Sequence, residues 1–229
     1  KKCKNNGYHV DIMALTGAKI ITNSLGIKTL GFKDFIQEKN REKIKYFGKK
    51  ILYENYTHES GIDKEESIYY LGINWLENLE RYGEEMTKRI YNKVKRHSFL
   101  PIKFFERLIK KYKYNLVITT NSPKSERAAI IAANNLKIKS IRIEDLFFDD
   151  DLQLDLIKKL GVDYSKSIGK YKSAPTKIFV MCEYTKTIYK ENKKTMLLET
   201  SESDVIVTGQ PIFDNLINKS FDYLDKKNN

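Results

Sequence analysis

The chain has 229 residues, of which 41% are hydrophobic, and a formal net charge of +12. This length and hydrophobic content suffice to bury a core and exclude a disordered chain. No apolar run reaches the ~18 residues of a membrane span, and Lys1–Gly7 lacks the apolar core of a signal peptide. These features predict a soluble, cytoplasmic protein, and the charge favours nucleic acid, an anionic membrane surface or a phosphate-bearing substrate as partner.

Short, nearly continuous apolar runs alternate with helical patterns along the chain. Such runs are typical of parallel strands covered on both faces, and they lie at 8–15, 115–120, 138–143, 177–182 and 204–208. Apolar residues at spacings of three and four predict helices over 101–112, 123–136 and 152–160. The alternation predicts an α/β protein with a Rossmann-like, doubly wound parallel sheet and helices on both faces.

The N-terminal part of the chain departs from this alternation. Gly7 is a helix stop, so residues 1–6 are expected to be the tail of a helix whose beginning lies upstream of this sequence. Residues 32–97 are rich in Tyr and Lys and predict a helical insertion. Its candidate breaks are Gly48, Gly61, Gly72 and Gly83.

A strongly basic segment follows the insertion. Ten basic residues and one acidic residue, Glu106, lie between Lys88 and Lys113. One interpretation places apolar side chains of this segment outward on an anionic membrane, and its membrane-facing candidates are Arg96, Phe99, Lys103 and Phe104. The other is an amphipathic helix after Pro101 with lysines on the solvent side and a core-facing side formed by Ile102, Phe105, Leu108 and Ile109.

Ligands of parallel sheets bind beyond the carboxyl ends of the strands, which directs attention to the loops after them. The loop after 115–120 predicts either an anion site at a helix N-terminus or only an N-cap. Carboxylates in the loop after 138–143 can bond acceptor hydroxyls, pair with Arg127, or simply balance charge. The substrate-binding candidates are Thr120, Asn121, Ser122, Arg127, Glu144 and Asp145.

Candidate catalytic residues are few. His58 stands beside Glu59, and a carboxylate can orient an imidazole as a general base; the alternative is a structural histidine. Cys3 and Cys182 lack CxxC spacing, which indicates neither a zinc site nor a disulfide framework, and Cys182 is predicted to be a small side chain within a strand. Common nucleotide, hydrolase and zinc signatures are absent from the sequence, so neither a metal nor a cofactor is expected.

Four segments together resemble the N-terminal half of a GT-B fold glycosyltransferase, and also the related UDP-N-acetylglucosamine 2-epimerases and polysaccharide-biosynthesis transferases. These segments are Asn115–Ala129, Lys139–Leu146, Ile178–Thr185 and Val205–Asp214, so the resemblance covers about residues 100 to 215. It implies a Rossmann-like domain over 1–215 and, over 216–229, a linker or the start of a missing second domain. Gly209 and Pro211 would form the turn into the interdomain hinge.

The resemblance also implies a function. GT-B enzymes transfer a sugar from a nucleotide-sugar donor to an acceptor, here a glycan or a lipid-phosphate, and the N-terminal domain supplies the acceptor site and the general base. They need no metal, because helix dipoles and basic side chains stabilise the departing diphosphate. The chain alone is expected to be inactive, and the complete enzyme to work peripherally at the inner face of the membrane.

Two other functions remain open at this point. The first is part of a sugar-nucleotide 2-epimerase of the same superfamily, which would turn over UDP-N-acetylglucosamine without an acceptor. The second is a basic polyanion-binding module driven by the charge of +12. Nucleic acid is the less favoured partner, because the sequence lacks an aromatic RNP pattern and a helix-turn-helix.

Overall fold

A computed structural model of the chain describes residues 5–14, 17–56, 63–120, 124–144, 171, 173–191 and 203–210. The chain forms two compact units, an N-terminal unit, Lys1–Thr87, and a C-terminal unit, Lys88–Asn229. The division falls inside the stretch 32–97 that the sequence predicts as a helical insertion.

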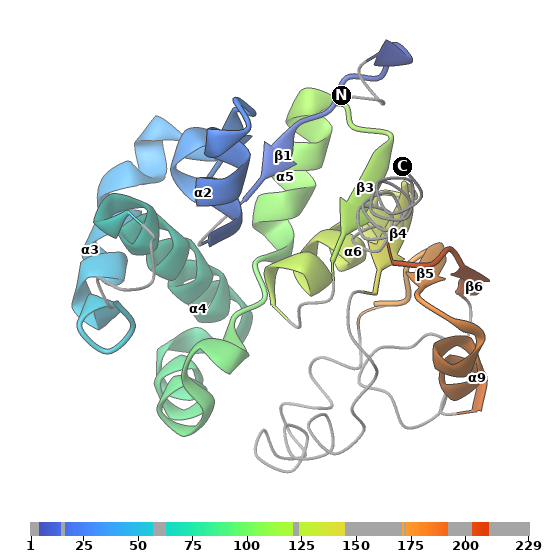
Figure 1. Cartoon of the computed structure of the whole chain (residues 1–229). Coiled ribbons are helices and arrows are strands. Elements are labelled where there is room, and N and C mark those ends of the chain that lie inside the picture. Colours follow the sequence, from blue (N-terminus) through green and yellow to red (C-terminus); the bar gives the residue numbers. More distant parts are fainter. Residues whose placement is uncertain are drawn as a thin grey trace, which may run out of the picture. The chain divides into compact units, whose positions relative to one another are not determined.

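The N-terminal unit begins with a small parallel βαβ arrangement (Figure 1). Strand β1 (Ile12–Met13) pairs with β2 (Thr29–Leu30), and helix α2 (Gly17–Ser24) connects them. Gly7 has φ +79°, a left-handed conformation that glycine adopts without strain and that suits the expected helix stop. The strand predicted over 8–15 is confirmed only at its centre, because β1 spans two residues.

Helices make up most of the rest of this unit in its described part, as the sequence predicts for 32–97. Two short 3₁₀ helices, η1 (Phe32–Phe35) and η2 (Glu38–Asn40), lead into α3 (Arg41–Leu52). The long helix α4 (Lys64–Val94) follows and continues into the C-terminal unit.

The glycines of these helices serve two purposes. Gly83 has φ +75° and kinks α4, which confirms the predicted break. Gly48 and Gly72 lie inside helices, so the breaks predicted there are wrong. A Cβ at Gly48 would overlap the backbone carbonyl of Ile68, and one at Gly72 would overlap that of Ile44. The two glycines therefore allow α3 and α4 to pack backbone against backbone, while Gly61 lies outside the described residues.

The C-terminal unit is built on a four-stranded, fully parallel sheet (Figure 1). Its strands are β3 (Leu116–Thr119), β4 (Lys139–Ile143), β5 (Lys177–Val180) and β6 (Asp204–Val207), and their order in the sheet is their order in the chain. All four strands predicted in this region are confirmed, with slightly shorter bounds. The runs predict strands covered on both faces, but Leu116 and Ile118 of β3 are exposed among the described residues.

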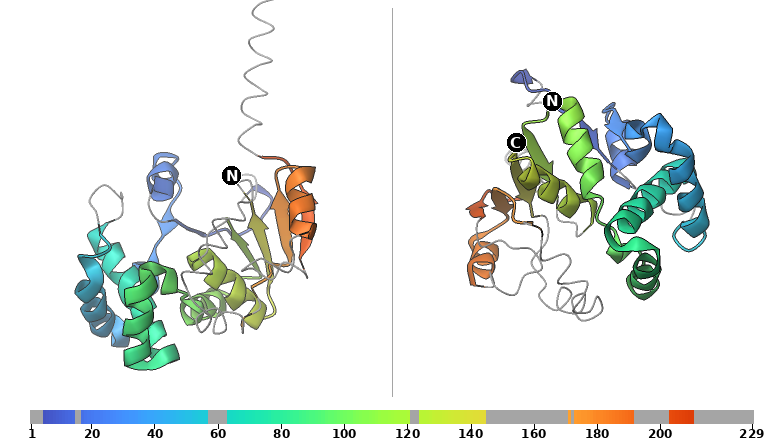
Figure 2. Two further views of the ribbon diagram at one scale, coloured as in Figure 1. Left: turned by 90° about the horizontal axis from the view of Figure 1, so that it is seen from below. Right: turned by 180° about the vertical axis from the view of Figure 1, so that it is seen from behind.

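Within the described residues, three helices accompany this sheet, together with the 3₁₀ helix η4 (Lys95–Ser98). They are α5 (Ile102–Tyr112), α6 (Ser125–Asn135) and α9 (Glu183–Glu191). Helix α6 connects β3 to β4 and packs on α5, while α9 connects β5 to β6 and lies beside them (Figure 2). Tyr189 of α9 forms a buried cluster with Ile178 and Val180.

The architecture is α/β with parallel sheets and is compatible with a Rossmann-like fold. When strands lie in the sheet in their chain order, right-handed crossovers place the connecting helices on one face of the sheet. Helices on both faces of the sheet therefore stay a prediction. The helix predicted over 152–160 lies outside the described residues.

Helix α5 bears on both interpretations of the basic segment, which are partly compatible. Ile102, Phe105 and Ile109 are buried, as the amphipathic-helix interpretation predicts, and Leu108 is half-buried. Phe99 and Phe104 are also buried, with exposures of 1% and 3%, so their proposed outward orientation is wrong. Arg96 and Lys103 are exposed. In the part of the chain that the structure describes, no helix combines the length and apolar character of a membrane span.

Candidate functional site

The carboxyl ends of β3, β4, β5 and β6 lie at one edge of the C-terminal sheet, because the strands are parallel. Residues following the strands therefore gather there, and in open α/β sheets this edge is the usual ligand side. Thr120 follows β3 and is exposed; Glu144 follows β4; Gly209 lies just beyond β6. Gly209 has φ +77°, which fits the predicted turn.

A buried polar network anchors α9 to β4 at this edge. The guanidinium of Arg142 donates a hydrogen bond of 2.8 Å from Nη2 to the hydroxyl of Tyr189, and its carbon lies 5.4 Å from the centre of the Tyr189 ring. The Tyr189 hydroxyl donates in turn to the carboxylate of Glu144, whose Oε2 also lies 3.5 Å from Nε of Arg142. Because all three side chains are at most 3% exposed, they form a buried ion pair bridged by a phenol.

This environment changes the chemistry of its members. Burial raises the pKa of Tyr189, and the nearby Glu144 carboxylate raises it further against the opposing effect of Arg142. The phenol therefore stays protonated and donates to Glu144. The backbone N–H of Glu144 is itself bonded to the carbonyl oxygen of Phe179, at 2.8 Å. The Glu144 carboxylate is buried and contacts Arg142 and Tyr189.

Two residues that are neighbours in the sheet each carry a buried side-chain atom with no hydrogen-bond partner among the described residues. These atoms are the hydroxyl of Thr119, which ends β3, and Nη1 of Arg142. Thr119 is 7% exposed and Arg142 is 2% exposed, and the two residues are register partners across β3 and β4. Because nearly all buried polar groups in proteins are hydrogen-bonded, this pair marks the carboxyl edge as a place for a further polar partner.

Helix α6 starts at the same edge, after β3. It begins at Ser125, two residues later than predicted, and its N-cap residue Lys124 makes no side-chain capping bond. Burial lowers the pKa of Lys124, and the positive charge of Arg96 lowers it further. Arg127, in the first turn, is buried at 6% exposure. The start of α6 therefore carries two partly or fully buried cationic side chains.

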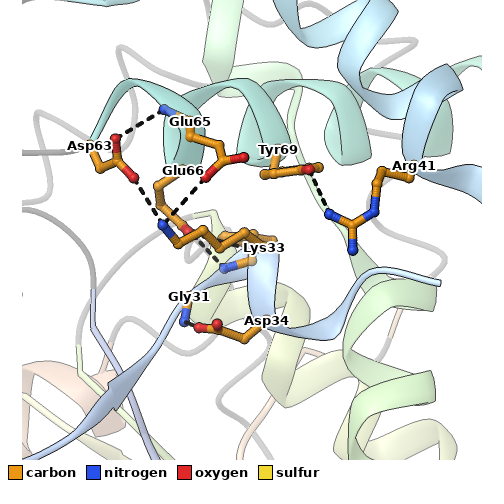
Figure 3. A network of polar contacts seen from close by, with 9 residues as sticks. Gly31, Lys33, Asp34, Arg41, Asp63, Glu65, Glu66 and Tyr69 are labelled. Atoms are coloured by element: carbon orange, nitrogen blue, oxygen red, sulfur yellow. Dashed lines mark hydrogen bonds and ion pairs between the residues drawn. The ribbon is translucent and has the colours of Figure 1, made fainter. Parts of the chain in front are cut away.

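A second polar network lies in the N-terminal unit around the turn that follows β2 (Figure 3). The buried carboxylate of Glu66, on α4, accepts hydrogen bonds from the backbone N–H groups of Phe32 and Lys33. The backbone N–H of Gly31 donates 2.7 Å to Asp34. Burial raises the pKa of Glu66, and the two backbone donors partly offset that rise. Glu66 thus satisfies two backbone N–H groups at the start of η1.

The side chain of Lys33 extends toward the start of α4 (Figure 3). Its ammonium donates 2.9 Å to Asp63 and lies 3.7 Å from Glu65. The hydrogen bond to Lys33 lowers the pKa of Asp63. Nearby, Arg41 donates 3.0 Å to the hydroxyl of Tyr69. These contacts hold η1 and α3 against α4 within the N-terminal unit.

Several predicted site residues lie outside the described residues, among them both catalytic candidates. They are His58, Glu59, Asn121, Ser122, Asp145 and Pro211. Cys182 is described, but it follows β5 instead of lying within it, and hydrogen bonding to Thr185 lowers the pKa of its thiol. In the described ranges no group of His, Cys, Asp and Glu side chains has the arrangement of a metal site.

Sequence reasoning missed Thr119, Arg142 and Tyr189. The signal for Arg142 was present: a charged residue at an alternating, buried position of an otherwise apolar strand needs a partner. Tyr189 carries no such signal, because a tyrosine on an amphipathic helix is ordinary.

Comparison with known proteins found no matching family model, no matching curated protein and no matching solved structure. The fold itself places the chain in the class of α/β proteins with a parallel sheet that is compatible with a Rossmann-like fold.

Proposed function

We propose that this chain is the acceptor-side domain of a GT-B type glycosyltransferase. In this proposal the carboxyl edge of the C-terminal sheet faces the acceptor, and a further domain supplies most contacts to the nucleotide-sugar donor. The acceptor is a glycan or a lipid-phosphate, and the reaction serves polysaccharide biosynthesis. The four segments that resemble this superfamily include β3 to β6, whose parallel order fits a half of such an enzyme.

The observation that carries the proposal is the pair of unpartnered polar atoms at Thr119 and Arg142. They lie at the ligand side of the sheet, and the exposed Thr120 follows directly. A hydroxyl and a guanidinium are suited to a sugar hydroxyl or a phosphate oxygen. Arg127 and Lys124 add positive charge at the start of α6, where an anionic acceptor group would be stabilised.

The division of chemical roles follows from this arrangement. The sheet edge orients the acceptor, whose hydroxyl attacks the anomeric carbon after a general base removes its proton. His58, oriented by Glu59, remains our candidate for that base. The buried Arg142, Tyr189 and Glu144 network fixes the geometry of the edge and is not expected to exchange protons during turnover.

A sugar-nucleotide 2-epimerase of the same superfamily is the second candidate, because the same segments resemble it. The epimerase differs from the glycosyltransferase in one measurable property: it turns over its sugar nucleotide without an acceptor.

The test is a coupled glycosyl-transfer and epimerase assay on the gene product that contains this chain. A panel of UDP- and GDP-sugars is offered with and without a lipid-phosphate extract. Donor consumption that requires the extract, and that is lost in His58→Ala or Glu59→Ala, supports the transferase. Turnover without acceptor supports the epimerase, and the absence of any turnover contradicts both.

A further inference from the structure

One face of α5 consists of basic side chains. Lys103, Arg107, Lys110 and Lys111 are all exposed. At 3.6 residues per turn and 1.5 Å per residue, they occupy roughly 100° of the helix surface over about 12 Å of its length. We call these four residues the α5 basic face.

The surroundings of this face are also basic. Every other Lys and Arg from Lys88 to Lys113 is exposed: Lys88, Arg89, Lys93, Lys95, Arg96 and Lys113. The single acid in this segment, Glu106, accepts a hydrogen bond of 2.7 Å from the side-chain amide of Asn135. The charge of +12 over the whole chain is therefore concentrated here: this segment carries ten basic residues and one acidic residue.

The opposite side of α5 is occupied by the core. Ile102, Phe104, Phe105 and Ile109 are buried, and so is Phe99 just before the helix. No large apolar side chain of this helix is left to enter a bilayer beside the basic face, apart from the partly exposed Tyr112. Any attraction of the α5 basic face to a partner is thus electrostatic.

Tyr112 also argues against single-stranded nucleic acid as the partner. Such binding relies on aromatic rings on which bases stack. The Tyr112 ring stacks on Tyr114, with centroids 5.8 Å apart, and the ammonium of Lys111 lies 5.2 Å from its centre. The ring next to the α5 basic face is therefore already engaged.

We propose that the α5 basic face adsorbs to an anionic bilayer by charge alone, without inserting side chains. A convex helix face presents its ammonium and guanidinium groups to a plane of headgroups, which attract basic residues near the surface. The proposal does not depend on sugar transfer, because its readout is vesicle binding.

The experiment is co-sedimentation of the whole chain with vesicles. One set is phosphatidylcholine alone, and the other contains roughly 30% phosphatidylglycerol. The test variant is Lys103→Gln, Arg107→Gln, Lys110→Gln and Lys111→Gln combined, since Gln keeps helix propensity. The matched control combines Lys39→Gln, Lys43→Gln, Lys49→Gln and Lys50→Gln. These four lysines are exposed residues of the N-terminal unit, and their substitution removes the same charge.

We expect the chain to bind only the anionic vesicles. Sodium chloride should release it between about 0.1 M and about 0.5 M, because screening increases. The α5 variant should lose at least tenfold in partitioning to the vesicles. The control should lose less than about threefold, because its lysines lie off the proposed face. Equal losses in both variants, binding that survives high salt, equal binding to neutral vesicles, or no binding would each overturn the proposal. Tighter binding to polyuridylate than to the anionic vesicles, compared at equal phosphate concentration and salt, would assign the face to nucleic acid instead.

Discussion

The guanidinium of Arg142, on strand β4, donates a hydrogen bond of 2.8 Å to the hydroxyl of Tyr189, on helix α9, and both side chains are 2% exposed. The Tyr189 hydroxyl donates a hydrogen bond to the carboxylate of Glu144. A single phenol thus joins two buried charges and connects a helix to the edge of the sheet that we assign to the acceptor.

Replacing this phenol should destabilise the C-terminal unit. Tyr189→Phe keeps the ring but removes the donor to Glu144 and the acceptor for Arg142, which costs about 1–3 kcal/mol of unfolding free energy for buried polar groups. Urea unfolding measures the difference. Tyr184→Phe, on the same helix but 67% exposed, is the control and should change stability by less than about 0.5 kcal/mol. Equal effects of the two substitutions would contradict the structural role of the network.

Adding a methyl group between α3 and α4 should also be costly. In Gly48→Ala or Gly72→Ala, the new Cβ meets a backbone carbonyl that cannot move without separating the helices. We expect a loss of about 1–3 kcal/mol or more, as for overpacked cores. The exposed neighbour Lys49→Ala serves as control, and thermal unfolding is the measurement. Wild-type stability of both glycine variants would disprove the close approach.

The buried carboxylate of Glu66 should make the unfolding free energy depend on pH in a specific direction. Its pKa is raised in the folded state, chiefly by burial, so the folded protein binds this proton more tightly than the unfolded chain does. Its contribution to stability therefore increases as pH falls through the raised pKa and levels off below the ordinary pKa of a glutamate.

The comparison with Glu66→Gln isolates this group, because all other titrations cancel and Gln cannot ionise. The unfolding free energy of the wild type should rise relative to the variant as the pH is lowered from neutral toward the ordinary range of a glutamate. A difference that stays constant, or that falls over this interval, would show that the pKa of Glu66 is not raised.

The sequence was sufficient to predict the sheet of the C-terminal unit. Continuous apolar runs such as 177–182 have one dominant explanation when helical patterns separate them, so strands β3 to β6 were found within a few residues. The core-facing side of α5 was predicted for the same reason, since Ile102, Phe105 and Ile109 repeat with helical spacing.

The errors have identifiable physical causes. The sequence predicts breaks at Gly48 and Gly72 because glycine weakens helices locally, yet a close crossing of two helices requires the same residue. It predicts Phe99 and Phe104 to face outward because basic residues lie close to them in the chain. Along a helix, a buried residue can stand directly beside an exposed residue in the sequence. A neighbouring lysine therefore says little about whether a phenylalanine is buried. Arg142 and Tyr189 meet only in three dimensions, through helix packing, and Thr119 becomes a neighbour of Arg142 only through strand register.

Thr119 offers the most direct test of the proposed acceptor edge. Its buried hydroxyl has no hydrogen-bond partner among the described residues, so Thr119→Val should leave stability unchanged or slightly raised. Thr87→Val is the matched control, because the Thr87 hydroxyl is likewise buried without a partner in the part of the chain that is described, but lies on α4. Urea unfolding establishes that both variants fold.

The decisive measurement is the KM for acceptor of these two variants in the glycosyl-transfer assay on the gene product that contains this chain. The account predicts that Thr119→Val raises this KM about fivefold to tenfold, the value of one lost hydrogen bond, at unchanged stability. Thr87→Val should keep the wild-type KM. A wild-type KM in Thr119→Val, or the same rise in both variants, would contradict an acceptor site at the carboxyl edge of the sheet.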